Sequence, residues 1–171
     1  MDALREFDIE YIKLKDGEHR FEYHIRDSFF ETFNSSLSAR DLQVGVLLIR
    51  SGSTFTLVFG INGRIELDCD RCLSRIELPI HGSYTVLVKI TEHPMESEDD
   101  LIYLSPHDYK LNIAQHIYDF VHLSIPIKKT CSDIGKVCDP AVTAKINSVI
   151  DVDTVPDTLP ERDTDDDEEE D

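Results

Sequence analysis

Two pairs of cysteines are the residues of this chain whose type and spacing could do chemistry. Cys69 and Cys72 are three apart in "LDCDRCLSRIELPI", and Cys131 and Cys138 are seven apart in "KKTCSDIGKVCDP". A C-x-x-C at a tight corner can present two thiolates to one tetrahedral metal, with Zn–S distances of about 2.3 Å. A complete site needs two more ligands, and the chain contains four cysteines in total. All four are therefore candidate metal ligands, with zinc as the candidate cofactor.

Other interpretations of the cysteines stay open at this point. Reduced thiols can be small buried apolar groups in a compartment that keeps them reduced. A partner protein could also complete a shared site. A redox pair of the thioredoxin type would have its C-x-x-C at the start of a helix beside a βαβ unit. Antiparallel strands are expected on both sides of Cys69 and Cys72, which argues against that last interpretation.

The elements that must position these cysteines are mostly strands. Alternating apolar residues predict a meander through "STFTLVFG", "RIELDC", "RIELPI" and "SYTVLVKI". Apolar residues spaced by three and four predict one main helix near 111–124, which ends before Pro126. The predicted fold class is α+β, predominantly antiparallel β, as a barrel- or sandwich-like meander.

The hairpin that carries the first cysteine pair can be given a register. A two-residue turn at Asn62-Gly63 would set apolar residues opposite charged ones. A three-residue loop over 61–63 sets apolar residues opposite one another on one face, so we predict that loop. The following hairpin is then predicted to have its loop at 70–75. In that arrangement Cys69 lies at the rim of the core and Cys72 faces outward.

The net charge of −18 divides unequally along the chain. Residues 151–171 hold twelve acids and one arginine, or −11, which leaves −7 for the first 150 residues. A run such as "DTDDDEEED" repels itself and has little to bury, so we expect an acidic disordered tail over 151–171. We expect residues 1–150 to form a single β-rich domain. The tail could serve solubility, attract a basic partner or oppose non-specific RNA binding.

A local excess of positive charge surrounds the second cysteine pair. Residues 125–145 contain four lysines and two acids, a net charge of +2. If the two cysteine segments meet in space, two arginines from the first segment join this group. The alternative is that all of them are ordinary surface bases. The candidate residues for contacting RNA phosphate or a protein partner are Arg71, Arg75, Lys128, Lys129 and Lys136.

Catalysis and membrane insertion find no support in the sequence. The chain has no G-x-S-x-G, P-loop, G-x-G-x-x-G or H-E-x-x-H motif, and its seven histidines are scattered. We therefore expect neither an enzyme nor a small-molecule substrate. No window approaches about 18 consecutive apolar residues, and the first residues, "MDALREFDIEYIKLKDG", do not resemble a secretory signal. A cytoplasmic location is expected.

Two segments together resemble the YceD family, described as large ribosomal RNA subunit accumulation proteins. "LDCDRCL" is similar to the family's C-x-R-C-L motif, and "LNIAQHIYDFVHLSIPIKKTC" is similar to its downstream helix, proline and cysteine. The resemblance covers roughly residues 40–140. The matching positions are Cys69, Arg71, Cys72, Leu73, Leu111, Ile113, Ile117, Leu123, Pro126 and Cys131.

The resemblance implies a non-enzymatic factor for ribosome biogenesis that supports accumulation or maturation of large-subunit ribosomal RNA. The implied partners are that RNA, a basic ribosomal protein, or both. A basic ribosomal protein could bind the acidic surface and tail at least as easily as RNA binds the local basic residues. The alternative function, from the residues alone, is a zinc-binding or thiol-based regulatory module that uses Cys69, Cys72, Cys131 and Cys138.

Overall fold

The computed structural model describes residues 4–93, 96 and 100–149 of this chain. The acidic tail expected over 151–171 lies outside the described residues, so that expectation and the domain boundary at 150 stay predictions. The elements, in chain order, are η1 Arg5–Phe7, β1 Asp8–Ile9, η2 Tyr11–Lys13, β2 Gly17–Ile25, α1 Asp27–Thr32, β3 Ser38–Ser51, β4 Thr54–Asp68, β5 Arg75–Ile90, β6 Leu101–Leu104, β7 Leu111–Asn112, α2 Ala114–Leu123, η3 Cys131–Ile134 and α3 Pro140–Val149.

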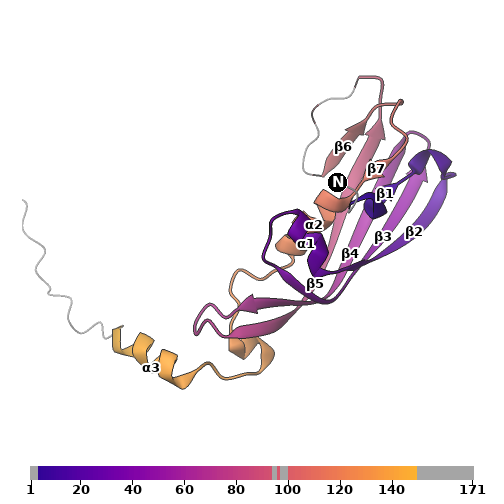
Figure 1. Cartoon of the computed structure of the whole chain (residues 1–171). Helices are drawn as coiled ribbons and strands as arrows, with labels where there is room; N and C mark the ends of the chain where they lie inside the picture. Colours follow the sequence, from indigo (N-terminus) through magenta and orange to yellow (C-terminus); the bar gives the residue numbers. More distant parts are fainter. Residues whose placement is uncertain (1–3, 94–95, 97–99, 150–171) are drawn as a thin grey trace, which may run out of the picture.

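A five-stranded sheet dominates the molecule (Figure 1), in the order β2-β3-β4-β5-β6. The first three pairings are antiparallel, and only β6 runs parallel to its neighbour β5. A separate two-stranded sheet joins β1 to β7. The predicted α+β class with mostly antiparallel strands is confirmed. Of the two arrangements left open, a closed barrel does not occur in the described part of the chain, because β2 and β6 are edge strands.

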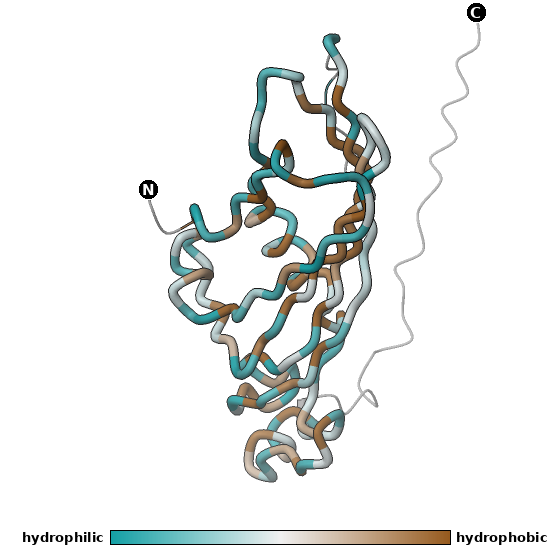
Figure 2. Tube along the Cα trace, turned by 90° about the vertical axis from the view of Figure 1, so that its right-hand side faces the viewer, coloured by the Kyte–Doolittle hydropathy of each residue, from teal (hydrophilic) through white to brown (hydrophobic). Residues whose placement is uncertain are grey.

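One face of the large sheet carries the main core. Along β4 every second residue is buried, as the alternation in the sequence requires, from Phe55 to Ile61. Apolar and polar residues alternate in the same way along the strands in Figure 2. Helices α1 and α2 and the small β1–β7 sheet cover this face, and Phe120 of α2 packs edge-on against Phe59 of β4.

Helix α2 confirms the predicted main helix, although it is shorter than the predicted span. Its buried residues Ile117 and Val121, together with Ile113 just before it, form the apolar stripe that the spacing predicts. Residues 111–112 are a strand instead, because they pair with β1.

The predicted three-residue loop over 61–63 is wrong. Strand β4 runs without interruption from residue 54 to 68, and Gly63 lies opposite an irregularity in β3 between Arg40 and Gln43. A Cβ atom on Gly63 would come within 2.6 Å of the Leu42 Cα and 2.7 Å of the Asp41 carbonyl oxygen. The glycine permits a close approach of two backbones rather than a reversal of the chain. Strands β4 and β5 therefore continue as a long hairpin arm beyond α1 and α2 (Figure 1).

No helix among the described residues is long and apolar enough to cross a membrane.

Candidate metal centre

The first cysteine pair lies at the tip of the β4–β5 arm. Asp68 pairs with Arg75, so the hairpin loop spans residues 69–74 and not the predicted 70–75. Within it the Cys69 N–H donates to the Ser74 carbonyl oxygen at 2.9 Å, and the Leu73 N–H donates to the Cys69 carbonyl oxygen at 2.9 Å. Leu73 takes a left-handed conformation, with φ of 58°. This tight corner turns both cysteine side chains inward, so the prediction that Cys72 faces outward is wrong: only 6% of it is exposed.

The second cysteine pair is held by η3 and the turn after it. Thr130 and Asp133 form a reciprocal capping box, in which the Thr130 N–H donates to the Asp133 carboxylate at 2.6 Å. Gly135 closes the turn with a left-handed φ of 70°, which a glycine adopts without strain. The Lys136 N–H then donates to the Cys131 carbonyl oxygen at 2.8 Å, which brings the chain back toward Cys131 before Cys138.

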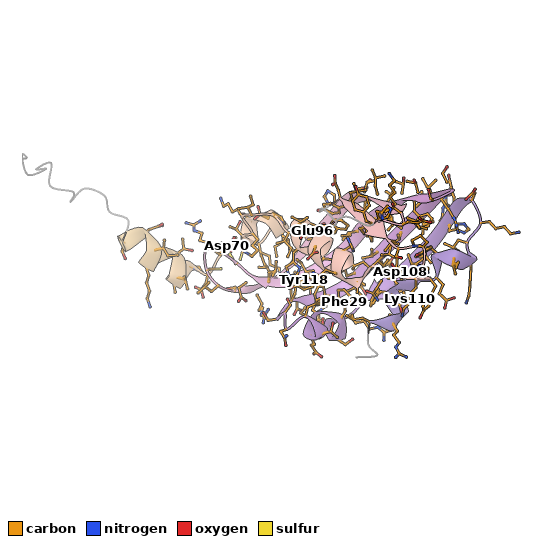
Figure 3. All side chains as sticks on the ribbon, turned by 90° about the horizontal axis from the view of Figure 1, so that it is seen from above. Phe29, Asp70, Glu96, Asp108, Lys110 and Tyr118 are labelled. Carbon is orange, nitrogen blue, oxygen red and sulfur yellow. The ribbon has the colours of Figure 1, made fainter. Side chains whose placement is uncertain are left out.

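Asp70 and Lys129 join the two segments. The Asp70 N–H donates to the Lys129 carbonyl oxygen, and the Lys129 N–H donates to the Asp70 carboxylate, both at 2.8 Å. The Lys129 ammonium group lies 2.6 Å from the same carboxylate. This ion pair lowers the pKa of Asp70, mainly through the hydrogen bond from the Lys129 side chain. Asp70 marks the junction between the arm and the C-terminal elements in Figure 3.

All four cysteine sulfurs meet at this junction. The Cys72 and Cys131 Sγ atoms lie 3.5 Å apart, the Cys69 and Cys138 Sγ atoms lie 3.8 Å apart, and all four lie within 4.8 Å of one another. Sulfurs around a tetrahedral zinc ion with bonds of about 2.3 Å are about 3.8 Å apart. A disulfide requires about 2.05 Å, and all four cysteines are free thiols. The arrangement thus fits a Cys₄ site.

The surroundings of the four thiols affect their ionisation in opposite directions. The side-chain hydroxyl and backbone of Ser74 lower the pKa of Cys72 to about 6. Burial raises the pKa of Cys69, but nearby backbone N–H groups, including that of Arg71, outweigh it and leave the pKa lowered. Burial raises the pKa of Cys131 to about 12 and also raises that of Cys138. The surroundings thus lower the pKa of one cysteine pair and raise that of the other, and a bound cation would stabilise all four thiolates together.

The cysteines also form most of a second, small core. In the described part of the chain, three of its four buried residues are Cys69, Cys72 and Cys131, and the fourth is Ile76. The three partly buried residues packed against it are Ile134, Cys138 and Val142. So few apolar side chains bury little surface, and domains of this size usually need a metal or a covalent link. The physical role that fits the cysteines best is a structural metal centre.

The predicted partner-binding residues gather at the same end of the molecule, but they do not form one group. Arg71, Lys128 and Lys136 are exposed, and no ion pair holds them in the described part of the chain. Lys129 is committed to Asp70, as described above. Arg75 lies 3.4 Å from the Asp68 carboxylate on the hairpin arm. Of the five predicted residues, Arg75 and Lys129 thus form ion pairs within the protein, whereas the other three are free to contact a partner.

Helix α3 and the capping box are features of this site that sequence reasoning missed. The signal for α3 is Asp139 before Pro140, an N-cap followed by a proline at the first helical position. In the structure the Ala141 N–H donates to the Asp139 side chain at 2.8 Å. The T-x-x-D spacing of Thr130 and Asp133 is likewise a helix-start pattern.

Comparison with known proteins adds one finding to this geometry. The profile of a family described as "Large ribosomal RNA subunit accumulation protein YceD" matches residues 57–171. This range includes the β4–β5 arm and all four cysteines. The searches of curated proteins and of solved structures give no match.

Proposed function

Since this chain belongs to the YceD family of large ribosomal RNA subunit accumulation proteins, we propose that it supports the accumulation of that RNA by binding it, without catalysis, in the cytoplasm. The proposed contact surface is the end of the molecule that carries the cysteines. A basic ribosomal protein is the competing partner, and it would meet the acidic remainder of the molecule instead.

The observation that carries this proposal is the convergence of Arg71, Lys128 and Lys136. They come from two segments 57 residues apart along the chain, and the sulfur cluster and the Asp70–Lys129 link hold those segments together. Each cation is exposed and lacks an ion-pair partner among the described residues. Three cations at one end of the molecule can each contact an RNA phosphate, and each contact releases a counterion.

The acidity of the rest of the chain makes this binding selective rather than strong. A net charge of −18 opposes the approach of nucleic acid to most of the molecule. RNA phosphates would gain the most favourable contacts where the three cations project from the surface. Binding of this kind weakens steeply as salt rises.

The proposal is tested with the triple variant Arg71→Gln/Lys128→Gln/Lys136→Gln. We expect it to bind large-subunit ribosomal RNA fragments more weakly and to reduce the slope of log K against log salt by about 2, at about 0.7 per lost contact. The matched control is Lys15→Gln/Arg20→Gln/Lys89→Gln. It removes three exposed cations outside the cysteine end: Lys15 just before β2, Arg20 in β2, which is ion-paired with Glu18, and Lys89 in β5. It should leave affinity and slope nearly unchanged.

A cellular measurement completes this test. Cells that carry the triple variant in place of the natural chain should contain less large-subunit than small-subunit ribosomal RNA, whereas cells with the control variant should not. Equal loss of affinity in both variants would reject the cysteine end as the RNA surface. Binding of a purified basic ribosomal protein, with no RNA binding, would favour the competing partner.

A second candidate function is a zinc-binding module, which the sulfur geometry favours specifically. Cys69, Cys72, Cys131 and Cys138 would hold the ion, and the ion would supply the cross-link that the small core lacks. With four protein ligands no coordination position is left for substrate, so the role would be structural and compatible with RNA binding. A thiol-based regulatory role instead predicts reversible loss of RNA binding on mild oxidation, with pairing of Cys72 to Cys131.

A further inference from the structure

A groove lies between helix α3 and the corner that carries the first cysteine pair. It encloses about 930 Å³ and is separate from the sulfur cluster, although Cys138 borders both. The corner contributes Asp70 and Arg71, and the segment before η3 contributes Lys128 and Thr130. The other wall is formed by α3 and the residues just before it.

The lining of this groove combines apolar contacts with unpaired positive charge. Val137, Pro140 and Ile146 supply apolar surface, and 90% of Val137 is exposed. Among the described residues that line the groove, Asp70 is the only acid, and Lys129 pairs with it. The lining therefore leaves three charges, those of Arg71, Lys128 and Lys136, facing a partly apolar surface. An occupant with both acidic and apolar side chains matches this surface.

The chain itself contains such an occupant, directly after α3. Residues 151–171 begin two positions after Val149, and Ile146 and Asn147 already line the groove. The segment opens with "DVDTVPDTLPE", in which Val152, Val155 and Leu159 alternate with acids. It continues with "DTDDDEEED", which contributes eight of its twelve acids. This one segment of the same chain thus contains apolar residues that suit the apolar surface of the groove and acids that suit its three cations.

We propose that residues 151–171 bind back onto this groove within the same chain, with Val152, Val155 and Leu159 on its apolar surface and the acids beside its three cations. An extended chain spans about 3.3 Å per residue, so ten residues reach about 33 Å and can return along α3. Attachment gives such a segment an effective concentration in the millimolar range, so that even weak contacts are populated.

Since Arg71, Lys128 and Lys136 are also the proposed RNA contacts, the bound segment competes with RNA phosphate. This competition rests on the proposed function; the docking does not. Non-specific RNA would then be excluded until a ligand with enough well-placed phosphates displaces the segment.

The experiment uses the full chain and two variants of the segment. One replaces the acids of 163–171 by amides, and the other is Val152→Ser/Val155→Ser/Leu159→Ser, which leaves the net charge unchanged. Backbone amide resonances of Val137 and Thr143, in the groove lining, report docking. We expect both variants to shift these resonances and a synthetic peptide of residues 151–171 to reverse the shift. Unchanged resonances in both variants would overturn the docking.

Two further controls keep the result specific. In the Arg71→Gln/Lys128→Gln/Lys136→Gln chain the amide variant should cause no further shift, whereas in the Lys15→Gln/Arg20→Gln/Lys89→Gln chain it should still do so. Shifts in the full chain that disappear on dilution would show binding between molecules and overturn docking within one chain.

RNA affinity then tests the competition separately. The serine variant should bind a large-subunit ribosomal RNA fragment about tenfold more tightly at low salt, although its charge equals that of the natural chain. Shifted resonances with unchanged RNA affinity would leave the docking intact and reject the competition. Absence of RNA binding in every variant would reject the proposed function, while the resonance shifts would still decide the docking.

Discussion

At the scale of single residues, the four cysteine sulfurs lie together, but their surroundings shift the pKa values of the thiols in different directions. Cys72, beside Ser74, has its pKa lowered to about 6, whereas burial raises that of Cys131 to about 12. Their sulfurs nevertheless lie only 3.5 Å apart. Such a close pair in a small core is expected where a cation neutralises the thiolates. The geometry therefore allows each cysteine to serve as a ligand of one ion, although the pKa values of the four thiols are shifted in different directions.

Replacing one cysteine tests this role directly. The reduced natural chain should bind about one zinc ion, and Cys72→Ser should weaken binding by about 100-fold or more, since losing a ligand costs more than losing an outer-shell partner. Competition with a chromophoric chelator measures both affinities. Ser83→Ala, on the exposed side of β5, is the control and should bind zinc normally. A fully reduced natural chain that binds no zinc would contradict the metal centre.

At the scale of secondary-structure elements, the length of β4 determines where the cysteines lie. The strand passes from the main core to the arm without a break, because Gly63 accommodates the irregularity of β3 at Asp41 and Leu42. The two-stranded β1–β7 sheet lies over the main core and is fastened by Asp8, whose carboxylate accepts hydrogen bonds from Lys110 and Asn112. Strand β4 thus depends on the close backbone approach at Gly63, and the β1–β7 sheet depends on the hydrogen bonds that Asp8 accepts.

Gly63→Ala should destabilise the protein by about 2 kcal/mol, because its methyl group would overlap the backbone of β3. Chemical denaturation measures the free energy of unfolding. Gly45→Ala, in the neighbouring strand, is the matched control, since its Cβ would meet nothing within 4 Å. Equal effects of the two substitutions would contradict the close-approach explanation.

The Asp8 contact should make stability depend on pH. Hydrogen bonds from Lys110 and then Asn112 hold the pKa of Asp8 below its model-compound value of 3.8. Asp8 therefore contributes stability that is complete above about pH 4 and is lost as the pH falls through the lower folded-state pKa. Asp8→Asn should cost about 1 kcal/mol at pH 7 and progressively less in acid. A difference in unfolding free energy that stays constant from pH 7 to pH 2 would contradict this assignment.

At the scale of the whole molecule, two cores of unequal size follow one another along β4: the large one extends along the strand from Phe55 to Ile65, and the small one lies just beyond its C-terminal end. The large core fills one face of the sheet beneath α1 and α2, and the small one surrounds the cysteines. The strand of 15 residues extends over about 50 Å. The cysteine end also carries the three available cations and the groove beside α3. Both proposed binding events therefore require this end of the molecule to be ordered.

Removing metal should accordingly unfold one end of the molecule and not the other. With a zinc chelator present, amides of η3 and the following turn, including Gly135 and Lys136, should lose protection from hydrogen exchange. Amides in β3 and the sheet half of β4 should keep theirs. Mass spectrometry of peptides after exchange separates the two regions. Loss of protection throughout the sheet, or nowhere, would contradict two separately stabilised cores.

Features that follow from local pattern can be predicted from the sequence. Alternating apolar residues predicted strands, although the four predicted strands from 53 to 90 are the two continuous strands β4 and β5. Spacing of three and four predicted the helix around Ile117, and the residue types selected all four cysteines. The tertiary structure alone decided which of these come together. Sulfurs 59 and 69 residues apart meet because the Asp70–Lys129 link and the arm fix them, and no local pattern encodes such long-range pairing. Gly63 is a second example. The Asn62-Gly63 dipeptide is typical of a turn, but in the structure Gly63 lies inside β4, where the backbone of β3 approaches it closely.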